Sequence, residues 1–199
     1  MNDVIIMKSE IRQWIRKERR ELSSDWVSNA SRRVQERTVT LSEYESARAV
    51  GAYFALPSEV QTAKLLERCW HDGKEVCVPA FDPAQGAYTL ARADAGCALK
   101  KGELGIFEPA VRSSVEADAL QLIFVPGLAF DMYGGRLGHG AGHYDAMLRG
   151  AIGVFKIGLA FDFQLVDRIP MASADVSMNA IVTNTKVIRV DDNENGSKS

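Results

Sequence analysis

The sequence predicts an α/β fold: a single domain built on a mostly parallel, open sheet with helices on both faces, in a Rossmann-like, doubly wound arrangement. The first observation is a strand, a helix and a second strand that follow one another at 48–56, 58–71 and 75–79. This is the spacing of a right-handed crossover between parallel strands. The second observation is a pair of apolar runs, 120–126 and 155–161, whose composition is that of buried central strands.

The remaining elements follow from apolar periodicity and from helix-capping residues. A helix over 8–22 has an apolar stripe at the 3.6-residue period, with Trp14 among its members. Ser23 or Ser24 is a suitable N-cap for a second helix that ends near Thr38. The other expected elements are a short strand at 88–91, a turn-rich connector at 102–109, a helix that begins near 143, and a closing pair of strands at 180–183 and 187–190.

Composition and charge limit the classes of function. The chain has 199 residues, of which 46% are hydrophobic and 25% charged, and its net charge is −2, so nothing favours nucleic acid or an anionic membrane as a partner. No apolar run approaches the ~18 residues of a membrane span, and the N-terminus lacks the features of a signal peptide. Cys69, Cys77 and Cys97 form no CxxC pair, which indicates unpaired thiols in a reducing cytoplasm. In the absence of a repeat or linker, we assign 1–190 to one domain and the polar segment 191–199 to a disordered tail.

A glycine-rich stretch follows the most apolar run of the chain. Five of the nine residues from Gly134 to Gly142 are glycine. A buried strand, a glycine-rich loop and a helix start together form a phosphate-binding arrangement, because backbone N–H groups can point at an anion where no Cβ intervenes. The spacing matches neither a Walker A loop nor a GxGxxG fingerprint. A glycine-rich turn without a ligand is the alternative.

Four side chains of this stretch carry chemistry. The planar guanidinium of Arg136 suits bidentate contact with phosphate, and a carboxylate near phosphates, here Asp145, is a natural Mg²⁺ ligand. His139 and His143 have the i, i+4 spacing of a zinc site, but Gly140 disfavours a regular helix there and the glutamate of an HExxH motif is absent. A position for His139 beside phosphate is the better interpretation, and packing or solvent exposure stays open for both histidines.

Two further features allow both a structural and a functional interpretation. The first predicted helix carries a basic stripe, for which a solvated surface face is the preferred interpretation and a cationic wall beside a phosphate site is the alternative. Glu59 stands at the carboxyl end of a strand, where ligands gather in open α/β sheets, but an acidic first turn that stabilises a helix dipole is the preferred interpretation. Phe54 is a core residue by default. The basic stripe consists of Lys8, Arg12, Arg16 and Arg19.

Two motifs carry a resemblance to a known family. Residues 126–131 read Pro-Gly-Leu-Ala-Phe-Asp, and residues 134–145 read Gly-Gly-Arg-Leu-Gly-His-Gly-Ala-Gly-His-Tyr-Asp. The chain thereby resembles the 5-formyltetrahydrofolate cyclo-ligase family, also called 5,10-methenyltetrahydrofolate synthetase. The family signature is Pro-Gly-x-x-Phe-Asp followed by Gly-x-Arg-Leu-Gly-x-Gly-x-Gly-Tyr-Tyr-Asp. Weaker features in the same order are Lys8-x-x-x-Arg12, 57–62 and 105–109, so the resemblance covers nearly the whole chain.

The resemblance implies an ATP-dependent ring closure. ATP phosphorylates the formyl oxygen of 5-formyltetrahydrofolate, N10 attacks the activated carbon, and ADP and phosphate are released with 5,10-methenyltetrahydrofolate. It implies catalytic roles for Arg136 and Tyr144, and Mg²⁺ ligation by Asp145, with Asn179 as a further candidate. It implies folate contacts for Phe54, Glu59, His139 and His143. It implies ATP contacts for Lys8, Arg12, Arg136, Leu137, Gly138, His139, Gly140, Ala141, Gly142, His143 and Tyr144.

The implied partners are ATP and a reduced folate, without nucleic acid or a membrane, in a cytoplasmic monomer, with a dimer as the alternative. Three positions depart from the family pattern. His143 stands where the family usually has tyrosine, and Ala146 stands where bacterial relatives often have arginine. Asn179, with Asp175 nearby, stands where some members carry a metal-binding aspartate. These departures leave open a non-catalytic folate- or nucleotide-binding module that diverged from the family. An ATP-dependent enzyme with another substrate is a third hypothesis.

Overall fold

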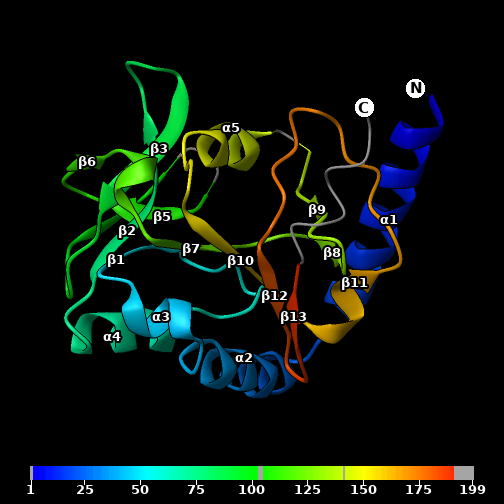
Figure 1. Ribbon diagram of the computed structural model, residues 1–199, viewed down its shortest axis with the longest axis horizontal. Coiled ribbons are helices and arrows are strands. Elements are labelled where there is room, and N and C mark those ends of the chain that lie inside the picture. The colour runs from blue at the N-terminus through cyan, green and yellow to red at the C-terminus, as the bar shows by residue number, and fades with distance from the viewer. Residues whose placement is uncertain (1, 103–104, 141, 191–199) are drawn as a thin grey trace.

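An eight-stranded sheet separates the helices into two groups (Figure 1). The computed structural model describes residues 2–102, 105–140 and 142–190. Five central strands are parallel, in the order β12-β10-β7-β1-β2, which is the doubly wound order 2-1-3-4-5 when these strands are numbered along the chain. Antiparallel strands complete both edges. Across the sheet, the strands are β13 (Val187–Arg189), β12 (Ala180–Val182), β10 (Phe155–Leu159), β7 (Leu122–Val125), β1 (Ala49–Gly51), β2 (Glu75–Asp82), β3 (Ala87–Arg92) and β6 (Ser114–Val115).

Helices cover both faces of the sheet because successive side chains of its central strands point to opposite sides. From β7, Leu122 and Phe124 join the hydrophobic cluster beneath α2, α3 and α4, whereas Ile123 and Val125 join the cluster beneath α5. Figure 1 shows α5 on one side of the sheet and the other three helices on the opposite side. The predicted mostly parallel sheet with helices on both faces is therefore confirmed. The helices are α2 (Ser24–Thr38), α3 (Ser42–Ser46), α4 (Ala63–His71) and α5 (His143–Arg149).

The first helix, α1 (Asn2–Arg20), packs on a smaller sheet instead of the main one. This three-stranded sheet has the order β11-β8-β9 and lies beside α1 in Figure 1. Ile15 of α1 is fully buried against two leucines at this sheet. Leu128 comes just before β8, and Leu137 is the last residue of β9. This packing brings other side chains of α1 to the loops that follow the strands. Arg19 donates to the carbonyl of Gly127 and Arg12 donates to the carbonyl of Gly138. The strands are β8 (Ala129–Asp131), β9 (Arg136–Leu137) and β11 (Leu165–Val166).

The segment 52–62 differs from the sequence prediction. The predicted strand 48–56 and the predicted helix 58–71 are both too long, because the residues between β1 and α4 are irregular. Side chains take up backbone groups there, so no regular element forms. The Oε2 atom of Glu59, for example, accepts the N–H of Leu56 at 3.0 Å. Glu59 therefore lies in a turn before α4, and the helix-dipole interpretation of this residue is wrong.

Several smaller predictions are also corrected or confirmed. α1 begins at Asn2 rather than at residue 8, and Trp14, expected in its buried stripe, is 44% exposed. The connector 102–109 contributes to a hairpin of β4 (Leu99–Lys101) and β5 (Phe107–Pro109). The N-cap of α2 is Ser23, whose hydroxyl oxygen accepts the N–H of Trp26 at 3.2 Å. The predicted closing strands are confirmed as the antiparallel pair β12 and β13.

In the part of the chain that the structure describes, no helix combines the length and the apolar character needed to cross a membrane. Cys69 and Cys77 are buried, Cys97 is half-buried, and all three are free thiols, as predicted. The predicted tail 191–199 lies outside the described residues, and the assignment of 1–190 to one domain stays a prediction. Two 3-10 turns complete the described elements, η1 (Ala117–Ala119) and η2 (Asp162–Gln164).

Candidate active site

A cleft of about 400 Å³ opens at the carboxyl ends of β1 and β7. Tyr53 and Phe54 line it just after β1, and Pro126 and Gly127 line it just after β7. The chain continues from β1 into α4 on one face of the sheet, and from β7 towards α5 on the other face. In doubly wound sheets, this reversal leaves a crevice at the strand ends, which is where ligands bind. The topology of the fold therefore accounts for the position of the cleft.

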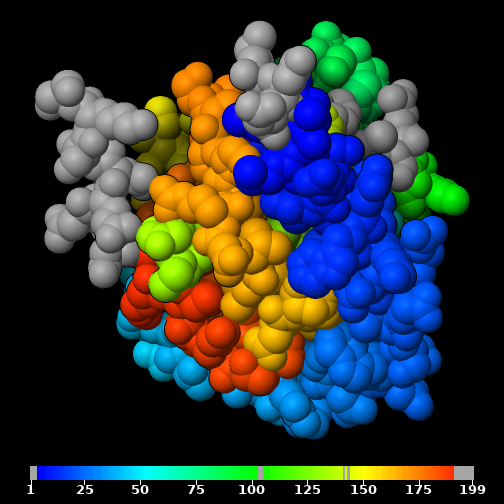
Figure 2. Space-filling model, turned by 90° about the vertical axis from the view of Figure 1, so that its right-hand side faces the viewer, coloured from blue at the N-terminus to red at the C-terminus, as the bar shows by residue number. Residues whose placement is uncertain are grey.

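One wall of the cleft comes from α1. Lys8 and Arg12 both line it, and the Nζ atom of Lys8 lies 2.7 Å from Oδ2 of Asp175. The Nε–H of Arg12 donates to the carbonyl of Gly138 at 3.1 Å. Figure 2 shows α1, in dark blue, beside the orange segment between β11 and β12, which carries Asp175. Lys8 and Arg12 of the basic stripe therefore face the cleft, which favours the cationic-wall interpretation for these two residues, whereas Arg16 is exposed and Arg19 is buried outside the cleft.

Arg136 lies at the base of the cleft with only 2% of its side chain exposed. Its Nη2 atom is 2.9 Å from Oδ2 of Asp145, and its Nη1 donates to the carbonyl of Pro126 at 3.1 Å. The guanidinium carbon also stands 5.6 Å from the centre of the Tyr144 ring. Because three partners fix this guanidinium, it is held in one orientation before any ligand binds.

The glycine-rich loop passes between this base and α1. Gly138, Gly140 and Gly142 all line the cleft, and α5 begins at the next residue, as the predicted helix start required. Gly140 and Gly142 have φ angles of +114° and +73°, which side chains with a Cβ rarely adopt. Ala141 and the side chain of His143 lie outside what the structure describes.

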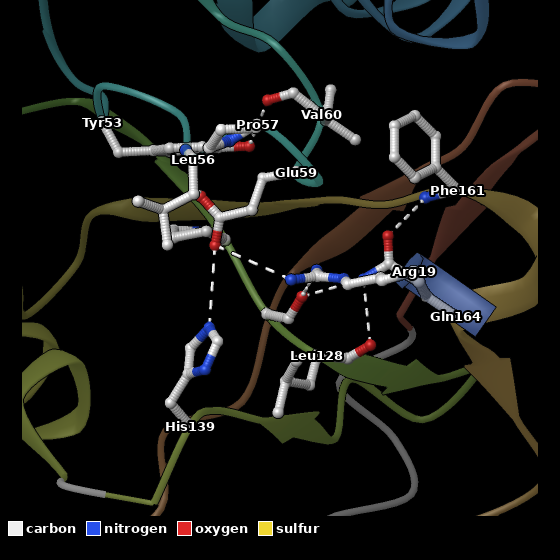
Figure 3. A network of polar contacts seen from close by, with 12 residues as sticks. Arg19, Tyr53, Leu56, Pro57, Glu59, Val60, Leu128, His139, Phe161 and Gln164 are labelled. Carbon is white, nitrogen blue, oxygen red and sulfur yellow. Dashed lines mark hydrogen bonds and ion pairs between the residues drawn. The ribbon is translucent and has the colours of Figure 1, made fainter. Parts of the chain in front are cut away.

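Glu59 also lines the cleft, and only 5% of the residue is exposed. Its Oε2 atom is occupied by the Leu56 N–H, whereas Oε1 lies 3.8 Å from Nε2 of His139 and 3.9 Å from Nη1 of Arg19 (Figure 3). Both of these distances are too long for a hydrogen bond. Phe54 is half-buried beside it. Glu59 thus combines a balanced charge with one carboxylate oxygen that can accept a ligand's hydrogen bond.

Two tyrosine hydroxyls stand close to this carboxylate. Burial, followed by the negative charge of Glu59, raises the pKa of Tyr144 well above its ordinary value. The same two causes, in the same order, raise the pKa of Tyr53. Both hydroxyls are therefore protonated at neutral pH and cannot act as bases. The Tyr53 hydroxyl donates to the carbonyl of Val60 at 3.1 Å, whereas the Tyr144 hydroxyl can donate to a ligand.

The structure places Asp175, and not Asn179, in the cleft. Asn179 stands at the start of β12, where its Oδ1 accepts the backbone N–H of Lys156 at 2.8 Å. Asp175 lines the cleft beside Lys8. Burial favours its neutral form, but hydrogen bonds from the Ala172 N–H and Lys8, together with the charge of Arg136, hold the pKa of Asp175 below its ordinary value. Among the described residues, no three His, Cys, Asp or Glu side chains form a ready metal centre.

Other cleft residues had no assigned role at the level of sequence. Ile106, just before β5, and Phe107, its first residue, both line the cleft. Their only signal was the family-like segment 105–109. Asp131 was noted as part of a motif, yet it is 1% exposed and accepts backbone N–H groups from three positions around the loop. A sequence cannot distinguish such a buried acceptor from a surface carboxylate.

Comparison with known proteins agrees with this geometry. A family model for the 5-formyltetrahydrofolate cyclo-ligase family matches residues 4–184. The chain belongs to this family. It is 31% identical over 176 residues to the 5-formyltetrahydrofolate cyclo-ligase of Haemophilus influenzae, which covers 86% of this chain and 94% of that protein. The Escherichia coli K12 protein of the same name is 31% identical over 178 residues, covering 87% and 98% of the two chains.

Solved structures of cyclo-ligase relatives have the same fold. The structure of Aquifex aeolicus 5,10-methenyltetrahydrofolate synthetase is similar with a TM-score of 0.84 and 31% identity, over 94% of each chain. The Mycoplasma pneumoniae 5,10-methenyltetrahydrofolate synthetase has a TM-score of 0.70 at 20% identity, over 89% of this chain and 98% of that one, and this shows the fold alone. The resemblance stated from the two motifs, and with it the prediction of a ligase, is confirmed.

Proposed function

We propose that this cyclo-ligase family member closes the ring of 5-formyltetrahydrofolate to give 5,10-methenyltetrahydrofolate, with ATP as co-substrate and Mg²⁺ as cofactor. The observation that carries the proposal is one cleft lined both by cationic side chains and by a buried carboxylate. Lys8, Arg12 and Arg136 supply the positive charge, and Glu59 supplies the carboxylate. We assign a triphosphate to the cations, which we call the phosphate end, and the hydrogen-bond donors of a pterin to Glu59, which we call the folate end.

At the phosphate end, we assign ATP contacts to Lys8, Arg12, Arg136 and the loop 137–144. The guanidiniums and the ammonium provide charge, and the positive-φ glycines keep the loop backbone free of Cβ atoms where phosphate oxygens approach. His139 lies between the two ends, because it belongs to this loop and its Nε2 lies 3.8 Å from Glu59. It therefore serves both ligands in this assignment, while His143 keeps its proposed contacts without structural support.

At the folate end, Oε1 of Glu59 faces the cleft without a hydrogen-bond partner among the described residues. The 2-amino-pyrimidine edge of a pterin presents N–H donors to such an oxygen. Phe54 and Tyr53 provide apolar surface for the ring system. The proposal therefore places the pterin against Glu59 and the formyl group towards Arg136.

The reaction then needs positioning and charge stabilisation more than acid–base chemistry. The formyl oxygen attacks the γ-phosphorus and ADP leaves. N10 attacks the formyl carbon, the carbon–oxygen bond to phosphate breaks, and N10 loses its proton. Arg136 stabilises charge on the transferring phosphoryl group, and the protonated Tyr144 hydroxyl donates a hydrogen bond to a developing oxyanion.

The residues present fit Mg²⁺. Asp145 and Asp175 both line the cleft, each balanced by one cation, Arg136 or Lys8. Mg²⁺ prefers one or two carboxylates completed by substrate phosphates and water. We assign its protein ligands to Asp145 and Asp175, so Asp175 takes the role first expected of Asn179. When bound, Mg²⁺ supplies positive charge next to the phosphate oxygens.

The test is a turnover assay with ATP, MgCl₂ and 5-formyltetrahydrofolate, in which the conjugated methenyl product is followed by its near-ultraviolet absorbance. The proposal expects absorbance that needs all three components, and release of one ADP for each product formed. Folate binding and thermal stabilisation without product would instead support the non-catalytic binding module. ATP hydrolysis that 5-formyltetrahydrofolate fails to stimulate would support another substrate.

The assay is sharpened by Arg136→Lys, which keeps the charge at the base of the cleft but loses the planar fork. We expect kcat to fall by at least about tenfold, since a point charge cannot contact two oxygens of the transferring phosphoryl group through parallel N–H donors as the guanidinium can. Arg33→Lys, on the exposed side of α2 and without a side-chain hydrogen bond or ion pair to another described residue, is the matched control. We also propose a monomer in the cytoplasm. The three free cysteines suit a reducing compartment.

A further inference from the structure

Arg19, in the last turn of α1, has a charged side chain that is buried outside the cleft. The residue is 8% exposed and does not line the cleft. A buried guanidinium destabilises the fold unless hydrogen bonds or an opposite charge compensate it, so the contacts of Arg19 indicate its role. Its Nη2 donates to the carbonyl of Gly127 at 2.7 Å, and its Nη1 lies 3.9 Å from Oε1 of Glu59. Burial lowers the pKa of Arg19, and the charge of Glu59 opposes this shift.

The Gly127 carbonyl that holds Arg19 is itself held by a second buried side chain. Gln164, which is fully buried, donates from Nε2 to the carbonyls of Gly127 and Leu128 at 2.8 and 2.9 Å. Its Oε1 accepts the backbone N–H of Phe161 at 2.9 Å. Figure 3 shows Gln164 on the side of Arg19 that is turned away from Glu59. A continuous polar chain thus runs from the end of β10, through the loop after β7, to the turn after β1.

The contact between Arg19 and Glu59 has an unusual combination of properties. Both side chains are 7% exposed, so their charges interact with little screening by water. At 3.9 Å, however, the pair balances charge without using the hydrogen-bonding capacity of Oε1. A shorter, bidentate ion pair would occupy both carboxylate oxygens. Arg19 stabilises the ionised carboxylate and leaves one of its oxygens available to a ligand.

We infer that Arg19 is a positioning residue for the folate end of the cleft, which holds the Glu59 carboxylate ionised and directed at the bound pterin. This inference rests on the proposed function, because it takes the ligand of Glu59 to be the pterin. Arg19 touches no substrate in this arrangement and acts through Glu59. The Gln164 chain fixes the loop after β7, so Arg19 has a rigid point of attachment.

The test compares Arg19→Met and Arg19→Lys with Arg20→Met. Methionine preserves most of the buried volume without the charge, and lysine keeps the charge without the fork that spans Gly127 and Glu59. Arg20 is the adjacent, exposed arginine of the same helix and serves as the matched control. We expect Arg19→Met to raise KM and Kd for 5-formyltetrahydrofolate about tenfold, with the KM of ATP changed less than about twofold. Arg19→Lys should recover part of this loss, and Arg20→Met should behave as the parent protein.

A double-mutant cycle with Glu59→Gln separates positioning from general support of the fold. If Arg19 acts through Glu59, Arg19→Met has little further effect on folate affinity in the Glu59→Gln background. Equal losses of ATP and folate affinity, or additive losses in the double variant, would overturn the inference. If Arg19→Met does not fold, the same comparison is made with Arg19→Lys, for which a rise of about two- to fivefold in folate KM alone is expected.

Direct binding of 5-formyltetrahydrofolate, measured by calorimetry, keeps this inference distinct from the proposed function. A parent protein that binds the folate without turning it over refutes the proposed function, while the effect of Arg19→Met on Kd still decides the inference. Normal turnover with an unchanged folate Kd in Arg19→Met overturns the inference alone. A parent protein that binds no folate overturns both.

Discussion

Asp131 provides a test of how the glycine-rich loop is held in place. It ends β8, is 1% exposed, and accepts three backbone N–H groups. Its Oδ1 accepts from Tyr133 and Gly135 at 2.9 and 2.8 Å, and its Oδ2 accepts from Ile169 at 2.7 Å. These bonds close the turn between β8 and β9 immediately before Arg136. The change Asp131→Asn keeps the size of the side chain and removes one acceptor.

The expected cost follows from these three bonds. The single oxygen of asparagine can still accept from Tyr133 and Gly135, but its NH₂ group then faces the buried N–H of Ile169. Loss of a hydrogen bond to a charged group costs about 1.5–3 kcal/mol, and the two remaining bonds weaken when their acceptor becomes neutral. The amide is cheaper to bury than the carboxylate, which offsets part of this loss and leaves a net cost of about 2 kcal/mol. For a chain of this length, the melting temperature should fall by about 4–8 °C.

The assay is thermal and urea unfolding of Asp131→Asn beside Asp167→Asn. Asp167 is exposed, and no hydrogen bond or ion pair joins it to another described residue, so its variant makes the same chemical change without loss of a contact. The urea slope should be unchanged in both variants, because the surface exposed on unfolding is the same. Equal melting temperatures for the two variants would refute the reasoning, since Asp131 would then contribute nothing through its three buried bonds.

Three further outcomes are expected. Gly158→Ala places a Cβ 2.5 Å from the Phe130 ring and should destabilise the protein by about 1–3 kcal/mol in urea melts, with partial rescue by Phe130→Leu. Asp175→Asn should raise the MgCl₂ concentration needed for half-maximal turnover and leave the folate KM unchanged; an unaltered Mg²⁺ requirement would remove Asp175 from the metal site. Glu43→Gln should cost less than about 1 kcal/mol at pH 7, because its partner Arg189 is half exposed. The hydrogen bond from Arg189 lowers the pKa of Glu43 from 4.5 to about 2, so this difference should persist above pH 4.5 and disappear as the pH falls to about 2.

The parts of the fold that the sequence predicted well are those with a strong local signal. The apolar run that contains β7 and the N-cap at Ser23 depend on composition and on neighbouring residues. The turn at 52–62 could not be predicted in the same way. One of its hydrogen bonds runs from the Gln61 N–H to the hydroxyl of Ser31, which lies in α2 and is distant in the sequence. Only tertiary contacts decide between a helix and a turn in such a segment.

The same distinction applies to the candidate site: residues within one local motif could be predicted, and residues placed by tertiary packing could not. Arg136, Asp145 and the glycines were found because they stand close together in one motif. The basic stripe was recognised, yet its direction depended on how α1 packs on the small sheet through Ile15, and that contact has no local signal. Asn179 was expected at the metal and the nearby Asp175 was not, because the loop before β12 contains no helix or strand whose periodicity would show which of the two side chains faces the cleft. The geometry corrects this choice, since only Asp175 reaches the cleft.

Three carboxylates of the cleft each have a cationic partner: Asp175 with Lys8, Asp145 with Arg136, and Glu59 with Arg19. This pairing neutralises the buried charges that the proposed reaction requires. A site for ATP, a metal ion and a polar folate needs buried charges of both signs, and any of them left unpaired would destabilise the fold. In the proposed function, phosphate and Mg²⁺ replace the internal partners of the first two pairs. The third pair has to persist, because the pterin approaches only the free oxygen of Glu59. The long, buried contact of Arg19 suits that requirement, whereas the short contacts of Lys8 and Arg136 suit an exchange of partners.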